Sequence, residues 1–178
     1  MNLLHSIKAH FENSNVNVVI EVPKGSQSKI EYDKEKETFI VDRIINTEVS
    51  FPFNYGFIPE TWSTDNDPLD VVVISSQSIP TGSQVEAKII GQLDTTDQEG
   101  PDSKIITVPI SENDPDIAKI NNVDDLDEKI HEKIKFFYKN YKINEPGRWV
   151  DINGFLSKKE AEKTLSDAIN RYHQHFHK

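Results

Sequence analysis

Short runs of apolar, often β-branched residues fill the first two thirds of the chain and predict strands. Turn-forming Gly, Pro, Asn and Asp residues separate these runs. The predicted strands are Val16–Val22, Lys29–Tyr32, Thr38–Ile45, Val71–Ile74, Val85–Leu93 and Lys104–Ile110.

Two helices are predicted in the last third of the chain. Over Asp124–Tyr141 the apolar residues recur every three or four positions and form one stripe, as on an amphipathic helix. A second helix is expected to begin at Ser157, because Glu160 completes a capping box. Its expected buried face comprises Ala161, Leu165, Ala168 and Tyr172. Strands followed by helices predict an α+β, β-rich fold.

The most informative polar segment is Asp65–Asp70, which directly precedes the apolar run Val71–Ile74. Its three carboxylates repel one another unless a cation lies among them. The hard ions Mg²⁺ and Mn²⁺ prefer such oxygen ligands. An EF-hand is excluded by spacing, since Leu69 takes a ligand position and Asp70 the glycine position. A capped turn between strands is the alternative, and for this segment alone it is the favoured interpretation.

A second acidic segment, Asp94–Lys104, lies between two predicted strands and turns at Gly100-Pro101. If both acidic loops share one end of a sheet, Asp97 and Asp102 would face the first segment. An ordinary acidic hairpin loop is the alternative, and it is favoured if this segment is taken alone.

Separated cations accompany these carboxylates. Lys29 and Glu31 are two positions apart, so their side chains share one face of a strand. The other candidates for a site role could instead be ordinary surface or core residues; they are Arg43, Lys104 and the pair Tyr141-Lys142. Together, acidic pairs and separated cations indicate a metal–phosphate site, because metals bridge to phosphate oxygens and Lys, Arg and Tyr donate to them.

The run Asp65–Val71 has the form D-x-D-P-x-D-V, and with its neighbours it resembles the soluble, Mg²⁺-dependent inorganic pyrophosphatases in their bacterial form. The resemblance extends from Val16 to the C-terminal helix. The matching segments, in chain order, are Val19–Pro23, Lys29–Asp33, Val41–Arg43, Pro52–Pro59, Asp65–Val71, Asp97–Lys104, Phe136-Phe137, Tyr141-Lys142 and Trp149.

The resemblance implies a five-stranded OB-like barrel flanked by helices, as one domain over residues 1–178 and usually assembled as a homohexamer. It implies an inorganic diphosphatase with several Mg²⁺ ions per site, Mn²⁺ being an alternative. The implied metal ligands are Asp65, Asp70, Asp97, Asp102 and Glu31. Asp67 would be the general base, and Glu21 would lie at the edge of the site. The implied phosphate-binding residues are Lys29, Arg43, Tyr55, Lys104, Tyr141 and Lys142.

The implied reaction is direct in-line attack of a metal-activated water on pyrophosphate, without a covalent intermediate. Asp67 would then only accept or orient a proton. The chain has no cysteine to act as a nucleophile, and Gly25 lacks the spaced partners of a phosphate-binding P-loop. Two departures from many bacterial members are Phe51, where Tyr is common, and Gln98, where Glu is common.

Composition agrees with this interpretation. The 178 residues suffice for one well-cored domain, and the net charge of −10 argues against nucleic-acid binding. The lack of cysteine, of a transmembrane-length apolar run and of a signal segment predicts a cytoplasmic protein without a membrane partner. His131 is expected to be exposed or at an interface. His173, His175 and His177 are expected in a frayed polar tail rather than a weak metal site.

Two alternatives stay open. A metal-dependent phosphohydrolase with another substrate, such as a nucleoside triphosphate, would need a base pocket, and none is evident in the sequence. A non-catalytic OB-type binding module would need a basic groove with stacking aromatic residues, which the acidic composition opposes.

Overall fold

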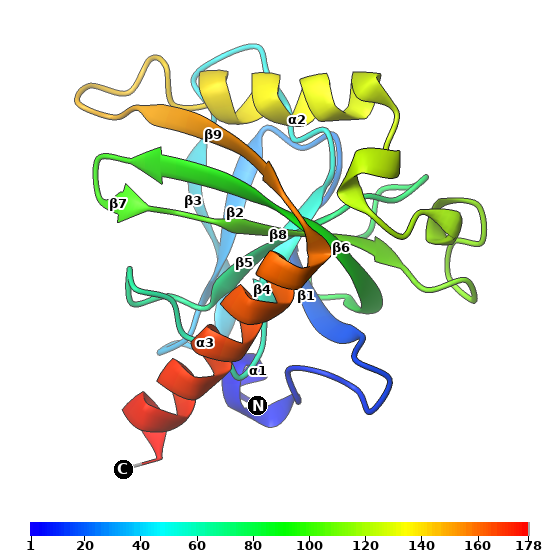
Figure 1. Ribbon diagram of the computed structural model, residues 1–178. Helices are drawn as coiled ribbons and strands as arrows, with labels where there is room; N and C mark the ends of the chain where they lie inside the picture. The colour runs from blue at the N-terminus through cyan, green and yellow to red at the C-terminus, as the bar shows by residue number, and fades with distance from the viewer. Residues whose placement is uncertain (178) are drawn as a thin grey trace.

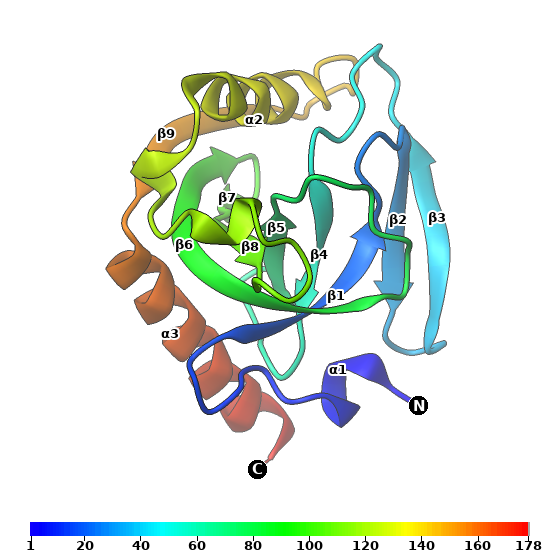
Figure 2. The same cartoon turned by 90° about the vertical axis from the view of Figure 1, so that its right-hand side faces the viewer.

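A computed structural model describes residues 1–177, and five of its strands close into a ring. These strands are, in order around the ring, β1 (Val16–Val22), β4 (Asn54–Ile58), β5 (Leu69–Val73), β8 (Lys104–Pro109) and β6 (Gln84–Asp97). The ring closes because β1 pairs with both β4 and β6, as Figure 2 shows. The predicted α+β class and the closed five-stranded sheet are therefore confirmed.

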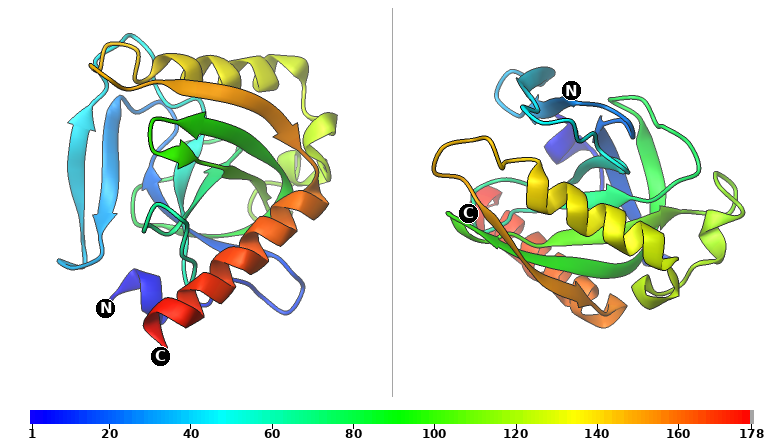
Figure 3. Two further views of the ribbon diagram at one scale, coloured as in Figure 1. Left: turned by 60° about the vertical axis from the view of Figure 1, so that its left-hand side comes forward. Right: turned by 90° about the horizontal axis from the view of Figure 1, so that it is seen from above.

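Four further strands extend the structure beyond the ring. The long strand β6 also pairs with β7 (Gly100–Pro101) and β9 (Val150–Leu156). Strands β2 (Ser28–Asp33) and β3 (Thr38–Ile44) form a separate two-stranded hairpin, which stands beside the ring in Figure 3.

The helices cover parts of the ring. In Figure 1, α2 (Glu128–Asn140) lies above the sheet and α3 (Lys158–Phe176) runs diagonally past β6 towards the end that carries both termini. The short helix α1 (Leu3–Ser6) lies near the same end, and two 3-10 turns, η1 (Ile117–Lys119) and η2 (Val123–Asp125), precede α2. No helix in residues 1–177 is both long and apolar enough to cross a membrane.

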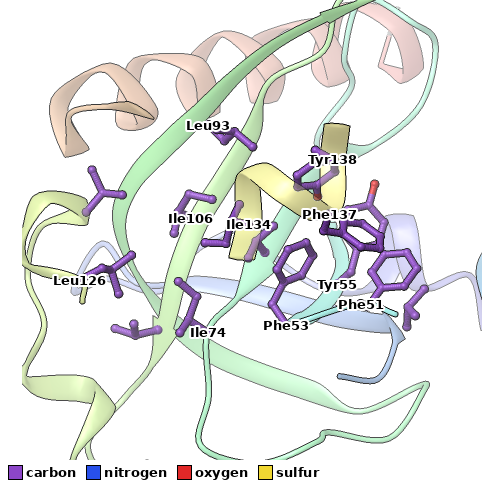
Figure 4. Close-up of a cluster of buried hydrophobic side chains, with 14 of the residues drawn as sticks. Phe51, Phe53, Tyr55, Ile74, Leu93, Ile106, Leu126, Ile134, Phe137 and Tyr138 are labelled. Atoms are coloured by element: carbon purple, nitrogen blue, oxygen red, sulfur yellow. The ribbon is translucent and has the colours of Figure 1, made fainter. Parts of the chain in front are cut away.

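Alternation along the ring strands builds two hydrophobic cores. Successive side chains of a strand point to opposite faces, so Val72 joins the core beneath α2, while Val71 and Val73 join the core beneath α3. The core beneath α2 includes Phe51, Phe53, Tyr55, Ile106, Phe137 and Tyr138, shown in Figure 4. Because the ring is buried on both faces, its strands hold fixed positions for the groups at their ends.

Gly56 in β4 permits a close approach between two ring strands. A Cβ at this position would lie 1.9 Å from the backbone oxygen of Val19 in β1. No real side chain tolerates such a contact, so the pairing of β1 with β4 requires glycine here.

The predicted strands all overlap observed ones, and Val16–Val22 has the observed bounds of β1. The prediction missed β4, β7 and β9, and it ended β6 at Leu93, whereas the strand continues to Asp97. Residues 94–97, which include Asp94 and Asp97, pair with β9 and belong to the sheet, so they are not in a hairpin loop.

The predicted helices are confirmed with one changed boundary. The helix expected from Asp124 begins at Glu128, because Asp127 caps it by accepting a hydrogen bond from the Lys129 amide at 2.8 Å. The capping box at Ser157 and Glu160 is present.

The expectation of an exposed His131 was wrong, and its position at an interface stays a prediction. The expected frayed C-terminal tail was also wrong. His131 is buried, and its Nε2 lies 2.7 Å from the backbone oxygen of Val123, because η2 folds back against α2. The C-terminal histidines do not form a frayed tail. Helix α3 continues to Phe176, and the His175 ring stacks on Trp62 with 5.1 Å between ring centroids.

Two buried tyrosines differ in how their hydroxyls are satisfied. Tyr138 and Tyr172 are 3 % and 2 % exposed. The Tyr172 hydroxyl lies 2.7 Å from Nδ1 of His5, whereas in the described chain the Tyr138 hydroxyl has no hydrogen-bond partner. An unpartnered buried hydroxyl costs free energy of folding, and a partnered one does not.

We therefore expect Tyr138→Phe to leave the melting temperature unchanged or to raise it by up to about 3 °C. Tyr172→Phe, the matched control, should lower it by about 2–4 °C because His5 loses its partner. Thermal unfolding followed by circular dichroism measures both. An equal loss in the two variants would mean that the Tyr138 hydroxyl is satisfied after all.

Candidate active site

The two acidic segments predicted from the sequence meet at one end of the ring. They come from the loop before β5 and from the β6–β8 connection. Between them lies an open cavity of about 520 Å³, lined by Thr64, Asp65, Asp97, Glu99, Pro101 and Asp102. The expectation that both segments share one end of the sheet is therefore confirmed.

A smaller cavity shares Asp65 and Asp102 with this one, and it shares Asp70 with a third cavity. A cavity of about 100 Å³ is lined in part by Asp65, Asp70 and Asp102 together with Arg171 from α3. A cavity of about 70 Å³ is lined by Glu21, Glu31, Tyr32, Tyr55, Phe57, Asp67, Pro68 and Asp70. Asp70 faces both, which makes it the centre of the acidic region.

Lys104 is the cation at this centre. It is 4 % exposed at the start of β8, and its ammonium pairs with Asp70 and lies 2.7 Å from Oδ1 of Asp102. Burial alone would lower the pKa of Lys104, but the charges of Asp70 and Asp102 outweigh burial and raise it well above its ordinary value. Lys104 is therefore fully charged at neutral pH.

Lys142 plays the same part for Asp97. The Nζ of Lys142 lies 3.2 Å from Oδ2 of Asp97, and both residues are buried. Burial would raise the pKa of Asp97, but the hydrogen bond from the Glu99 amide and the pair with Lys142 lower it. The neighbouring Tyr141 is buried too, with its ring stacked on Phe137 at 5.1 Å between centroids.

The β2–β3 hairpin supplies a second group of charges. Lys29 pairs with Glu31, in keeping with the prediction that the two side chains share one face of a strand, and its Nζ lies 3.4 Å from Oδ2 of Asp42. Burial would lower the pKa of Lys29, but the Glu31 carboxylate outweighs it and raises the pKa. Arg43, opposite Lys29 in the hairpin, donates to Glu145 at 2.8 Å and lines none of the three cavities.

Glu21 lies inside the edge of the site. Its carboxylate accepts a hydrogen bond from the Tyr32 amide at 2.8 Å. Burial raises the pKa of Glu21 to about 8, and the nearby charges of Asp70 and Glu31 add to the rise. Tyr55, also buried here, has a pKa well above its ordinary value because of burial and the charge of Asp70.

The loop before β5 carries Asp65 and Asp67. Burial and the like charge of Asp70 raise the pKa of Asp65 to about 6. The Asp67 amide donates to Oδ1 of Asp65 at 3.2 Å, and Asn66 between them has φ +66°. The Asp67 carboxylate is exposed and pairs with Lys34.

The carboxylates form an oxygen-only donor set under mutual repulsion, which suits a hard divalent cation. Within residues 1–177, however, no three acidic or histidine side chains are arranged so that they could hold a metal ion. The carboxylates of Asp70, Asp97 and Asp102 form ion pairs with lysine ammonium groups instead.

Several residues of the site were not predicted. Lys34 pairs with Asp67, Glu145 pairs with Arg43, and Arg171 lines the cavity at Asp65. Lys34 and Asp67 are 33 residues apart, and Arg43 and Glu145 are 102 residues apart. No local pattern marks such pairs, and only the charge of each residue was visible in the sequence.

Comparison with known proteins places this geometry in a family. The family model described as inorganic pyrophosphatase matches residues 18–173. The inorganic pyrophosphatase of Saccharolobus solfataricus is 46 % identical over 159 residues, which are 89 % of this chain and 92 % of that protein.

Solved structures agree. The inorganic pyrophosphatase of Helicobacter pylori superimposes with a TM-score of 0.90 at 38 % identity, covering 94 % of this chain and 99 % of that one. The inorganic pyrophosphatase of Thermus thermophilus gives a TM-score of 0.91 at 34 % identity, covering 97 % and 99 %. The resemblance seen in the sequence is thus confirmed, and the chain belongs to the inorganic pyrophosphatase family.

Proposed function

We propose that this chain is an inorganic diphosphatase, which hydrolyses inorganic pyrophosphate to two orthophosphates by direct in-line attack of water. The observation that carries the proposal is the ring-end cavity lined by crowded carboxylates, two of which, Asp102 and Asp97, pair with the buried lysines Lys104 and Lys142. Pyrophosphate is small and highly anionic, so cations are needed around it, and the lysines supply part of that charge.

Magnesium ions are the cofactors we propose, with manganese as the alternative. The family is metal-dependent in general. The proposed ligands are Asp65, Asp70, Asp97, Asp102 and Glu31. Their oxygen chemistry fits Mg²⁺, and a bound cation would offset the like charge of Asp70, which adds to burial in raising the pKa of Asp65. When bound, such ions neutralise phosphate charge and acidify water.

Asp67 is the general base that we propose. Its carboxylate lines the same cavity as Glu31, Tyr55 and Asp70, at the rim of the acidic region. Among the residues that line this cavity, Asp67 is the most exposed, with 62 % of its side chain accessible, so water reaches it. A carboxylate in that place accepts a proton from the attacking water.

The remaining polar residues would bind phosphate oxygens. Lys104 keeps its charge through Asp70 and Asp102, and Lys29 does so through Glu31. Lys142 pairs with Asp97. Burial keeps the phenol of Tyr55 protonated, so it serves as a donor. The full proposed set is Lys29, Arg43, Tyr55, Lys104, Tyr141 and Lys142, with Glu21 at the edge.

Phosphate release tests the proposed function. With millimolar Mg²⁺ we expect fast release from pyrophosphate and little from ATP or a simple phosphomonoester, because the cavity carries charge but no aromatic base pocket. A chelator should abolish the activity, and added Mg²⁺ should restore it. Preferred cleavage of ATP would favour another phosphohydrolase, and inactivity of the folded, Mg²⁺-supplied protein would favour a binding module.

Asp67→Asn tests the base. The amide keeps the size of the side chain but cannot accept the proton, so kcat should fall about a hundredfold or more while the melting temperature stays within about 2 °C. Asp167→Asn, an exposed carboxylate on α3, is the matched control and should retain full activity. A near-normal kcat for Asp67→Asn would remove Asp67 from the base role.

Assembly as a homohexamer is also proposed. Phe136 is 61 % exposed on α2, beside a cavity of about 600 Å³ between α2 and residues 48–52. Exposed aromatic surface of this kind is typical of an interface. Analytical ultracentrifugation should therefore give about six times the chain mass of 20.4 kDa. A monomer at micromolar concentration would contradict the proposal.

The cytoplasm is the location that we propose, since a chain without cysteine fits a reducing compartment. Cell fractionation tests this directly.

A further inference from the structure

The loop that carries Asp65 and Asp67 lies outside any strand, between β4 and β5. The side chain of Asp67 is mostly exposed, so the ring does not fix its orientation. A general base must lie within hydrogen-bond reach of the proton that it takes. Something other than strand pairing must therefore hold this carboxylate.

Lys34, in the turn of the β2–β3 hairpin, holds it through several contacts at once. Its ammonium pairs with the Asp67 carboxylate and donates to the backbone oxygen of Asn66 at 3.2 Å. The same Nζ lies 4.9 Å from the centroid of the Trp62 ring, in cation–π contact. The hairpin thus reaches across to both ends of the loop.

Trp62 gives Lys34 a rigid platform, because α3 holds Trp62 through several contacts. Its amide donates to the backbone oxygen of Ala168 at 2.9 Å, and its own oxygen accepts from Nε of Arg171 at 2.9 Å. The His175 ring stacks on it, and Trp62 is 7 % exposed.

The backbone of Lys34 is fixed as well. Its oxygen accepts a hydrogen bond from the Asn2 side chain at 2.9 Å. A single exposed ion pair contributes little to stability, but an ammonium held by a ring, a backbone oxygen and a carboxylate has one preferred position. The arrangement therefore sets geometry more than it adds free energy of folding.

We propose that Lys34 is a positioning residue for the reaction, holding the Asp67 carboxylate against the cavity that it shares with Glu31 and Asp70. The inference rests on the proposed function, since positioning matters only if Asp67 takes the proton. Lys34 does not itself line this cavity; it meets the lining through its ion pair with Asp67.

Kinetics of Lys34→Gln test this inference. We expect kcat to fall about tenfold or more, because a misplaced base loses much of its effect, while KM stays within about twofold. Lys36→Gln is the matched control, since Lys36 lies in the same turn and pairs with Asp33 rather than with the loop that carries Asp67. It removes the same charge and should leave kcat unchanged. Lys34→Arg should recover part of the activity, because a guanidinium also stacks on Trp62.

A double variant separates positioning from a general effect of charge. In the Asp67→Asn background, Lys34→Gln should cause no further loss of kcat, because the two residues act as a unit. Additive losses would overturn the inference, as would equal losses in the Lys34 and Lys36 variants. A fall in melting temperature large enough to explain the lost activity would also overturn it.

Failure of this inference and failure of the proposed function look different. Wild-type protein that does not hydrolyse pyrophosphate with Mg²⁺ overturns both. Active wild-type protein whose kcat Lys34→Gln leaves unchanged overturns only the role of Lys34.

Discussion

The mutual repulsion of carboxylates at one end of a rigid ring governs the rest of this structure. Asp70 and Asp97 belong to strands that are hydrogen-bonded to neighbours, so they cannot move apart to relieve their charge. Burial raises the pKa of Asp65, and the like charge of Asp70 adds to the rise. Buried lysines offset this repulsion by pairing with Asp70 and Asp97. The loop carboxylate Asp67 pairs with Lys34, which lies outside the ring.

The side chains on the ring and those on the loop are held in position in different ways. Groups at strand ends, such as Lys104, inherit their positions from backbone pairing and from two hydrophobic cores. Asp67 has no such support, and its position depends on side chains from the hairpin and on α3 behind Trp62. The helix that the sequence pattern marked only as a packing element thus also supports the loop of the site.

Periodicity predicted the elements that have strong local patterns and missed those that do not. β4 lies between Pro52 and Pro59 and contains Gly56, all of which look like turn signals, although the strand is fully buried. β9 mixes Asp151, Asn153 and Gly154 with its apolar residues, and it is a strand only because β6 extends far enough to pair with it. In both cases tertiary pairing overrides weak local preference.

The chemistry of the site was more predictable than its geometry, for a physical reason. Residue types and short spacings show which charges are present, and Lys29 with Glu31 could be paired from a spacing of two. Which lysine meets which carboxylate depends on ring closure, as for Lys104 with Asp70. Removing the carboxylate partner of a buried lysine leaves the charge of the lysine uncompensated. The site is therefore one coupled network, and the effect of changing any member depends on its partners.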